Sequence, residues 1–261
     1  MKQAHRSAGP PAISTRRQRA RLDSDIVGRK LATHSVLSAI EIAALSALAT
    51  QPAIFKTGAM VAVVGDRLDR ATFMIEGLAC RSKILADGRR QILSLLLPGD
   101  MVDAHASLLG HRDDNLEALT TCQVSHASQA ELKAVGLTHP GLGEAMLRQA
   151  LIEGAIGREW VINVGRRSTL EALAHLICEM KLRLDAVGLG VDDAYPFALT
   201  QEDMADALGV TSIHLNRVLK ILRSMGSISL QGKVLKICDW PRLLALANFS
   251  SSYLHLHRAA A

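Results

Sequence analysis

The chain has 261 residues, enough for one large domain or two ordinary ones, and 49% of them are apolar. Its net charge of +5 is unevenly placed: residues 1–30 carry six net positive charges, residues 31–195 four net negative and residues 196–261 three net positive. The apolar runs are too short to span a membrane, no secretory signal is recognisable, and the four cysteines form no CxxC pair. We therefore expect a cytoplasmic protein without a membrane partner, a disulfide framework or a compact metal–cysteine site.

The first residues are rich in arginine and almost free of acids. Because Gly9-Pro10-Pro11 interrupts any amphipathic helix there, residues 1–25 are predicted to be a disordered basic tail, with an organellar transit peptide as the alternative. Ordered structure is expected from Ile26. Ser38 and Glu41 have the spacing of a capping box, which predicts a helix over residues 39–49.

Short apolar runs separated by turn residues fill residues 53–130 and favour a small antiparallel barrel or sandwich. Asp87-Gly88 lies between two such runs and predicts a hairpin. The expected strands are Met60–Val64, Thr72–Ile75, Leu78–Leu85 and Arg90–Leu97. Residues 26–137 are therefore predicted to form a β-barrel domain.

From Pro140 the apolar period becomes helical, and the segment 138–167 is predicted to hold one long helix of about 25 residues, which spans about 37 Å at 1.5 Å per residue. One seam of this helix runs through Leu142, Met146, Ala150, Glu153, Ile156, Trp160 and Asn163. This seam fits a helix packed on its own barrel, and equally a two-helix coiled coil that dimerises the protein. The pattern alone does not decide between them.

Residues 168–261 are predicted to hold a winged helix-turn-helix. A second capping box at Ser168 and Glu171 opens a helix over 169–187. QEDMADALG and VTSIHLNRVLK then form two helices joined at Gly209, where glycine reaches positive φ without steric cost. A hairpin follows over residues 227–237, and a last helix over 240–248. An ordinary pair of antiparallel helices is the alternative.

The second of these two helices presents the residue types that a DNA major groove requires, with Arg217 placed for a bidentate pair with guanine. Thr211, Asn216 and Lys220 suit phosphate oxygens, His214 suits either a base or a phosphate, and Lys233 stands at the tip of the hairpin. The predicted DNA-binding residues are Thr211, Ser212, Ile213, His214, Asn216, Arg217, Lys220 and Lys233.

Barrel, long helix and winged helix-turn-helix, in this order, resemble the Crp–Fnr family of bacterial transcription regulators over about residues 26–258. The segment LTQEDMADALGVTSIHLNRVLKILRSMGSISLQGK is similar to the family's DNA-binding signature. The resemblance implies an α+β fold with a double-stranded β-helix, a homodimer joined through the long helix, and a two-fold symmetric site on double-stranded DNA with half-sites about 34–36 Å apart. It also implies contact with RNA polymerase.

The resemblance is incomplete at two sites. Ser212 and Ile213 stand where the family usually presents an arginine–glutamate pair, so the preferred DNA sequence should differ. Around the expected effector pocket, Asp103 and His105 do not match the family's Gly-Glu pair, and Arg112 is followed by Asp113 instead of a hydroxyl. Because an acid repels a cyclic phosphate, a typical cyclic nucleotide is not expected, although Asp103, His105 and Arg112 remain candidates for binding a small effector.

The sequence therefore predicts a dimeric, sequence-specific DNA-binding regulator that is not an enzyme and carries no cofactor or metal. The alternative is a small-molecule receptor of the cyclic-nucleotide type, in which ligand binding is the main activity. A third option, an enzyme or metal protein, rests on Asp103, His105 and His111, whose spacing fits no known metal-binding pattern. Solvated loop residues are the simpler interpretation of these three.

Overall fold

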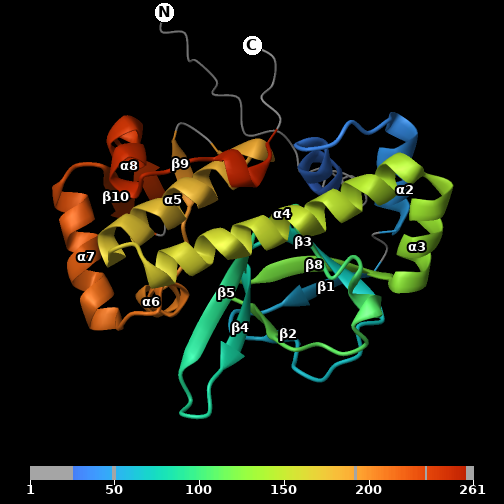
Figure 1. Ribbon diagram of the computed structural model, residues 1–261, viewed down its shortest axis with the longest axis horizontal. Coiled ribbons are helices and arrows are strands. Elements are labelled where there is room, and N and C mark those ends of the chain that lie inside the picture. Colours follow the sequence, from blue (N-terminus) through green and yellow to red (C-terminus); the bar gives the residue numbers. More distant parts are fainter. Residues whose placement is uncertain (1–25, 49–50, 191–192, 233, 257–261) are drawn as a thin grey trace, which may run out of the picture.

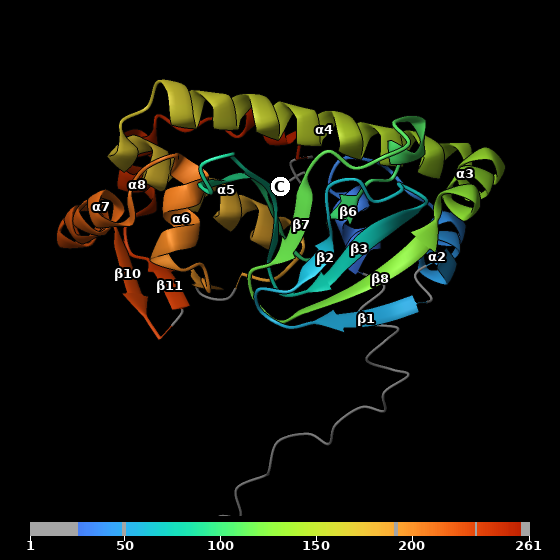
Figure 2. The ribbon, with the colours of Figure 1, turned by 90° about the horizontal axis from the view of Figure 1, so that it is seen from below.

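The computed structural model describes residues 26–48, 51–190, 193–232 and 234–256. Helix α4 (Pro140–Gly165) crosses the whole molecule, with a β-sandwich under one end and a smaller helical module under the other (Figure 1, Figure 2). The predicted basic tail, residues 1–25, and Lys233 lie outside the described residues. No described helix is both long and apolar enough to cross a membrane.

The β-sandwich consists of two four-stranded antiparallel sheets that face each other and do not close into one barrel. The first sheet has the strand order β1 (Gln51–Phe55), β8 (Cys122–Ser128), β3 (Arg70–Glu76), β6 (Met101–Val102). The second has the order β2 (Met60–Ala62), β7 (Asn115–Ala118), β4 (Ala79–Ile84), β5 (Arg90–Leu96). The predicted hairpin joins β4 to β5, with Gly88 at a φ of 85°.

Strand β3 is buried on both faces, which explains its almost continuous apolar sequence. Because side chains alternate along a strand, Met74 lies in the core between the two sheets, whereas Phe73 and Ile75 lie in the core beneath the helices. The helices over this second core are residues 26–32, α2 (Ala39–Leu48), α3 (Gln129–Thr138) and the first half of α4. The short 3₁₀ turn η1 (Ala106–Leu108) follows β6.

The C-terminal module begins with α5 (Thr169–Ala186), and both it and the long helix start and end close to their predicted bounds. The helix-turn-helix consists of α6 (Gln201–Leu208) and α7 (Ser212–Ser224). A three-stranded sheet orders β10 (Ile228–Gln231), β11 (Val234–Ile237) and β9 (Ala194–Pro196). Helix α8 (Trp240–Ala247) and the 3₁₀ turn η2 (Ser252–Leu254) complete the described chain and pack on α5 and α4.

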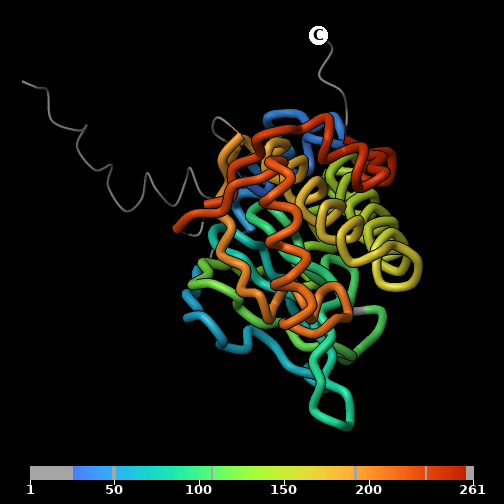
Figure 3. The backbone as a smooth tube through the Cα atoms, turned by 90° about the vertical axis from the view of Figure 1, so that its left-hand side faces the viewer, coloured from blue at the N-terminus to red at the C-terminus, as the bar shows by residue number. Residues whose placement is uncertain are grey.

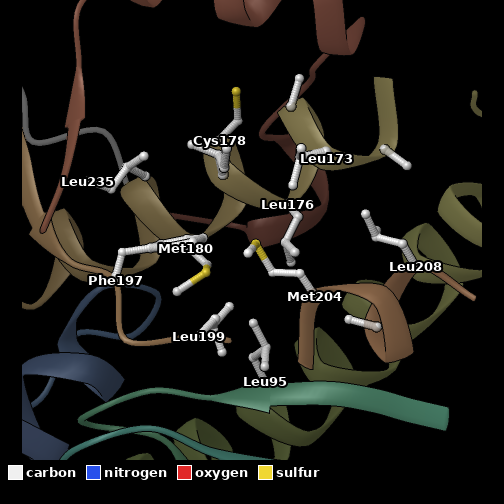
Figure 4. Packing of buried hydrophobic residues seen from close by; sticks show 14 of the residues in the cluster. Leu95, Leu173, Leu176, Cys178, Met180, Phe197, Leu199, Met204, Leu208 and Leu235 are labelled. Atoms are coloured by element: carbon white, nitrogen blue, oxygen red, sulfur yellow. The ribbon is translucent and has the colours of Figure 1, made fainter. Parts of the chain in front are cut away.

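The β-sandwich and the helix-turn-helix share one apolar core. Leu95 of β5 lies beside Met180 of α5, Leu199, and Met204 of α6 (Figure 4). At the edge of this core Arg90 donates to Asp203 at 2.6 Å and to Asp206 at 2.7 Å, both on α6. Strand β5 therefore fixes the position of α6, and α7 packs against α6.

Buried ion pairs tie the same parts together from the other side. Asp100, in the turn before β6, accepts from Arg183 of α5 at 2.6 Å and pairs with Lys30 at 3.2 Å. Arg183 also donates to Glu179 at 3.0 Å, and Glu179 accepts from Tyr253 in η2 at 2.9 Å. Because removing one partner of a buried pair leaves an uncompensated charge, these contacts hold the N-terminal helix, the sandwich and the C-terminal segment in one arrangement.

Candidate nucleic-acid interface

The sequence specifies both helices of the helix-turn-helix through their ends. Thr200 and Asp203 form a capping box, each side chain accepting from the backbone N–H of the other at 3.0 Å. Gly209 ends α6 with a φ of 66°, the left-handed conformation expected for it. Thr211 caps α7 by accepting from the N–H of His214 at 3.2 Å.

Helix α7 has one buried and one open face, and it lies at the end of the molecule that faces the viewer in Figure 3. Leu215, Val218, Leu219 and Leu222 point into the shared core. Of the predicted DNA-binding residues outside that core, six are exposed: Thr211, Ser212, Ile213, His214, Arg217 and Lys220. No acidic residue occurs within α7, so its open face is positively charged.

Arg217 and Lys220 form no hydrogen bond or ion pair with any residue that the structure describes. Two other predicted residues do have partners. The half-buried Asn216 donates to Gln201 at 2.5 Å, and Nε2 of His214 lies 3.0 Å from Oγ1 of Thr169 at the start of α5. Sequence reasoning missed Gln201 and Thr169, because their contacts with α7 depend on how the helices cross. Arg217 and Lys220 are therefore available to a polyanion.

The predicted effector residues lie at a second site, a pocket of about 270 Å³ between η1, β4 and α4. Arg81 donates to Asp103 at 2.7 Å and to Asp114 at 2.9 Å. Arg112 donates to Asp114 at 2.7 Å and to Asp103. These four residues form a closed ring of ion pairs, here called the Arg–Asp ring. Both arginines are thus bound by carboxylates of the same chain, whereas His105 is exposed at the rim.

Glu153 of α4 lines the same pocket and accepts from Gln149 at 3.2 Å. Burial raises the pKa of its carboxyl to about 7, although Arg81 nearby lowers it. In the folded protein Glu153 is therefore largely protonated at pH values where an exposed glutamate is charged.

We expect a Glu153→Gln variant to isolate this effect. Between about pH 4.5 and 7 the folded wild-type protein binds more protons at Glu153 than the unfolded chain, so its stability should fall as the pH rises through this window. The free energy of unfolding of the wild-type protein should fall by on the order of 3 kcal/mol relative to that of the variant. Above about pH 7 the difference between the two proteins should no longer change. Urea unfolding of both proteins at four pH values measures the difference. A constant difference from pH 4.5 to 7 would show that Glu153 titrates normally.

His175 also changes the stability of the protein with pH, so the wild-type protein has to be compared with the Glu153→Gln variant at each pH. Burial lowers the pKa of this α5 imidazole to about 4, so its contribution to stability grows as the pH rises from 4 to 6.5. That slope is opposite in sign to the slope from Glu153, and it is common to both proteins. Subtracting one unfolding curve from the other removes it.

Within the described chain, no group of three or more His, Cys, Asp or Glu side chains could hold a metal ion. Asp103 belongs to the Arg–Asp ring, whereas His105 and His111 are exposed. The interpretation of these three as solvated loop residues therefore fits His105 and His111 but is wrong for the buried Asp103.

The structure shows what the predicted seam of α4 packs against, a point that the sequence pattern left open. Leu142 and Met146 pack beneath the first sheet, and Ile156 and Trp160 pack in the core shared with α5. Nδ2 of Asn163 lies 3.2 Å from Nδ1 of the buried His175. Apart from the exposed Ala150, this side of the helix therefore lies on its own chain, as in the first of the two interpretations.

The opposite side of α4 is exposed and mostly apolar or small. We call it the outer stripe; it consists of Leu147, Ala150, Leu151, Gly154, Arg158, Val161 and Ile162. These residues recur at helical spacing over four turns, and no described residue covers them. A continuous exposed stripe of this kind indicates an interaction surface.

Comparison with known proteins gives matches over both halves of the chain. Residues 53–139 match the model of the cyclic nucleotide-binding domain, and residues 171–246 match the model of the Crp-like helix-turn-helix domain. The transcriptional activator protein FnrL of Cereibacter sphaeroides is 29% identical over 201 residues, which cover 76% of this chain and 80% of that protein. The nitrogen fixation regulation protein FixK of Bradyrhizobium diazoefficiens is 29% identical over 224 residues, 86% and 93% of the two chains.

Solved structures share the fold. FixK2 from Bradyrhizobium japonicum superimposes with a TM-score of 0.69 at 20% identity, over 77% of this chain and 98% of that one. A CRP-family transcriptional regulator from Thermus thermophilus gives a TM-score of 0.59 at 20% identity, over 76% and 97%. The order of β-sandwich, long helix and helix-turn-helix is thus common to all three proteins.

Proposed function

The chain belongs to the Crp–Fnr family of DNA-binding transcription regulators, and from this premise we propose that it acts as a homodimer on a two-fold symmetric DNA site. In this proposal α7 of each subunit enters a major groove, Arg217 pairs with a guanine and Lys220 contacts a phosphate. Thr211, Ser212, Ile213, His214, Asn216 and Lys233 complete the contact with DNA. Such a protein works where the chromosome lies, in the bacterial cytoplasm.

The observation that carries the proposal is the open face of α7. An exposed helix without acids, with an unpaired guanidinium and an unpaired ammonium one turn apart, has the chemistry that a groove between two phosphate backbones requires. The rigid attachment of α6 through Arg90 supports the same use, because a reading helix must be held in place. Neither feature depends on the family match.

The outer stripe of α4 supports the dimer. A two-fold axis brings the same stripe of both copies together, so the surface has to complement itself. Gly154 lies within the stripe, and a Cβ there would meet only Arg158, at 3.5 Å. Since its own chain does not require glycine at this point, and glycine costs about 0.5–1 kcal/mol in a helix, we infer that it lets the partner helix approach closely.

The Arg–Asp ring bears on the effector. A cyclic nucleotide would bring an anionic phosphate to a pocket where Asp103 and Asp114 already bind both arginines. The phosphate would have to displace these carboxylates or face them at close range. We propose that the sandwich takes no cyclic nucleotide, and that Asp103, His105 and Arg112 would serve only a small effector of different charge.

Isothermal calorimetry tests this part of the proposal. Titration with cyclic AMP or cyclic GMP should give only heats of dilution at millimolar concentration, because the anionic phosphate would face the carboxylates of the Arg–Asp ring. The neutral nucleoside adenosine is the control for charge. Saturable heat with one nucleotide per chain would favour the small-molecule receptor instead. Heat with adenosine but not with cyclic AMP would place the obstacle in the charges of the ring.

Selection of bound fragments from random DNA, followed by gel shifts, tests the main proposal. The protein should enrich one symmetric sequence, and its affinity should fall steeply with added salt because Lys and Arg release counterions from the phosphates. An affinity for DNA that does not change between 50 and 200 mM salt would contradict the proposed contacts. The family also implies contact with RNA polymerase. Repeating the gel shift with polymerase added tests whether the two proteins bind the DNA together.

A further inference from the structure

Ile213 is an exposed apolar residue in the first turn of α7, with 71% of its surface open to solvent. It lies four residues before Arg217, so both side chains leave the helix on the same open face, one turn apart. No residue that the structure describes covers it. If the open face of α7 lies in the major groove, as in the proposed function, the side chain of Ile213 faces the edge of a base.

The fold gives no reason for an isoleucine there. Its β-branch lowers helix propensity, and Leu215, Val218, Leu219 and Leu222 already fill the buried face of α7. Scattered exposed apolar residues need no explanation in general, but this one stands beside the unpaired guanidinium of Arg217. Its position therefore favours a role in binding.

We propose that Ile213 reads a thymine through the C5-methyl group that this base presents in the major groove. This inference rests on the proposed function. The methyl group of thymine is the apolar feature of the major-groove edge and is read by apolar side chains. Cytosine instead offers an amino donor, which a carboxylate accepts best, and α7 contains no acidic residue.

The helix geometry also places the thymine. Four residues of an α-helix rise about 6 Å, and base pairs are stacked about 3.4 Å apart. A helix lying along the groove therefore brings Ile213 within about two base pairs of the guanine that pairs with Arg217. Each half-site should contain a G·C pair and, one or two steps away, a T·A pair whose methyl group contacts Ile213.

Replacing thymine by deoxyuridine removes only the methyl group and tests this contact directly. Starting from the selected DNA site, each thymine of one half-site is replaced in turn and the affinity is measured by gel shift. One replacement should weaken binding by the wild-type protein about fourfold, the worth of one buried methyl group. Replacement in both half-sites should weaken it by about 15-fold.

The Ile213→Ala variant should bind the thymine and deoxyuridine sites equally well. The matched control is Ile40→Ala, because Ile40 on α2 is also 71% exposed and lies on the sandwich, far from α7. Ile40→Ala should keep the full preference for thymine. Ile213→Glu, which supplies a carboxylate, should shift the preference at the same position from thymine toward cytosine.

The outcomes separate this inference from the proposed function. If the protein selects a DNA site but every deoxyuridine replacement leaves its affinity unchanged, the thymine contact is wrong and the regulator remains. Equal loss with Ile213→Ala and wild type on deoxyuridine DNA would assign the methyl contact to another residue. A protein that selects no sequence would contradict the proposed function itself. Equal unfolding temperatures for wild type and variants confirm that the substitutions act on binding alone.

Discussion

A Leu151→Glu variant should be monomeric and should bind the symmetric DNA site at least 100-fold more weakly than the wild-type protein. Leu151 lies within the outer stripe of α4, with 66% of its surface exposed in the single chain. In the proposed dimer the stripe of each copy is covered by the other, so a carboxylate there is buried without a partner. An unpaired buried charge costs on the order of 3–5 kcal/mol, which converts a tight dimer into monomers at micromolar concentration.

Loss of the dimer also removes one of the two half-site contacts. Linking two binding modules raises the overall affinity by roughly 10²–10⁴-fold, and the variant should forfeit that factor. Sedimentation or light scattering gives the oligomeric state, and a gel shift gives the affinity. The matched control is Leu137→Glu, since Leu137 on α3 is 74% exposed and does not belong to the stripe. A Leu151→Glu protein that remains dimeric would show that the subunits meet elsewhere.

An Arg217→Ala variant should lose roughly 1–3 kcal/mol of binding free energy in each half-site, and therefore roughly 2–6 kcal/mol in the symmetric dimer. The reason is the bidentate pair between a guanidinium and the O6 and N7 atoms of guanine, for which the exposed and unpaired side chain of Arg217 is free. Specificity should relax at one position of each half-site and stay unchanged elsewhere. Selection of bound DNA with the variant measures this directly.

Lys220→Ala is the control for charge alone. Lys220 lies on the same helix, is exposed and is assigned to a phosphate, so its removal should weaken binding to all sequences equally. The slope of log affinity against log salt should also fall by about one unit for each lost phosphate contact. If Arg217→Ala behaved in the same way as Lys220→Ala, the arginine would be contacting a phosphate and not a base.

Local signals in the sequence predicted the elements well because each depends on residues close in the chain. Ser38 and Ser168 accept the backbone N–H groups expected of them, and Gly209 has the expected positive φ. The strand alternation and the Asp87-Gly88 turn likewise gave the β4–β5 hairpin. Such features involve three or four consecutive residues, so no knowledge of the packing is needed.

The partner of each helix face could not be predicted, because it depends on contacts between distant residues. Helix α4 carries apolar or small residues on two sides, and periodicity cannot tell which of them meets its own chain. Only the fold brings Asn163 against His175, and Trp160 against Glu179. No described residue packs on the outer stripe, and the sequence pattern did not distinguish this side of the helix from the buried one.

The effector pocket shows the same limit for charges. In the sequence Arg112 is followed by two acids, Asp113 and Asp114, and nothing there tells which of them pairs with it. The fold pairs Arg112 with its near neighbour Asp114, adds Asp103 from the end of β6 and brings in Arg81 from β4, which closes the Arg–Asp ring. The sequence therefore indicated that a site lies here, but only the structure shows that carboxylates of the same chain already pair with both arginines in it.

The most direct test of a dimeric DNA reader is the shape of the DNA site that the protein selects. Sequencing of fragments bound from random DNA, with a hydroxyl-radical footprint on the enriched sequence, gives both the symmetry and the spacing. We expect two inverted half-sites with centres about 34–36 Å apart, one turn of the double helix, each containing a G·C pair for Arg217. Enrichment of a single, non-repeated sequence, or protection of one groove only, would contradict the account.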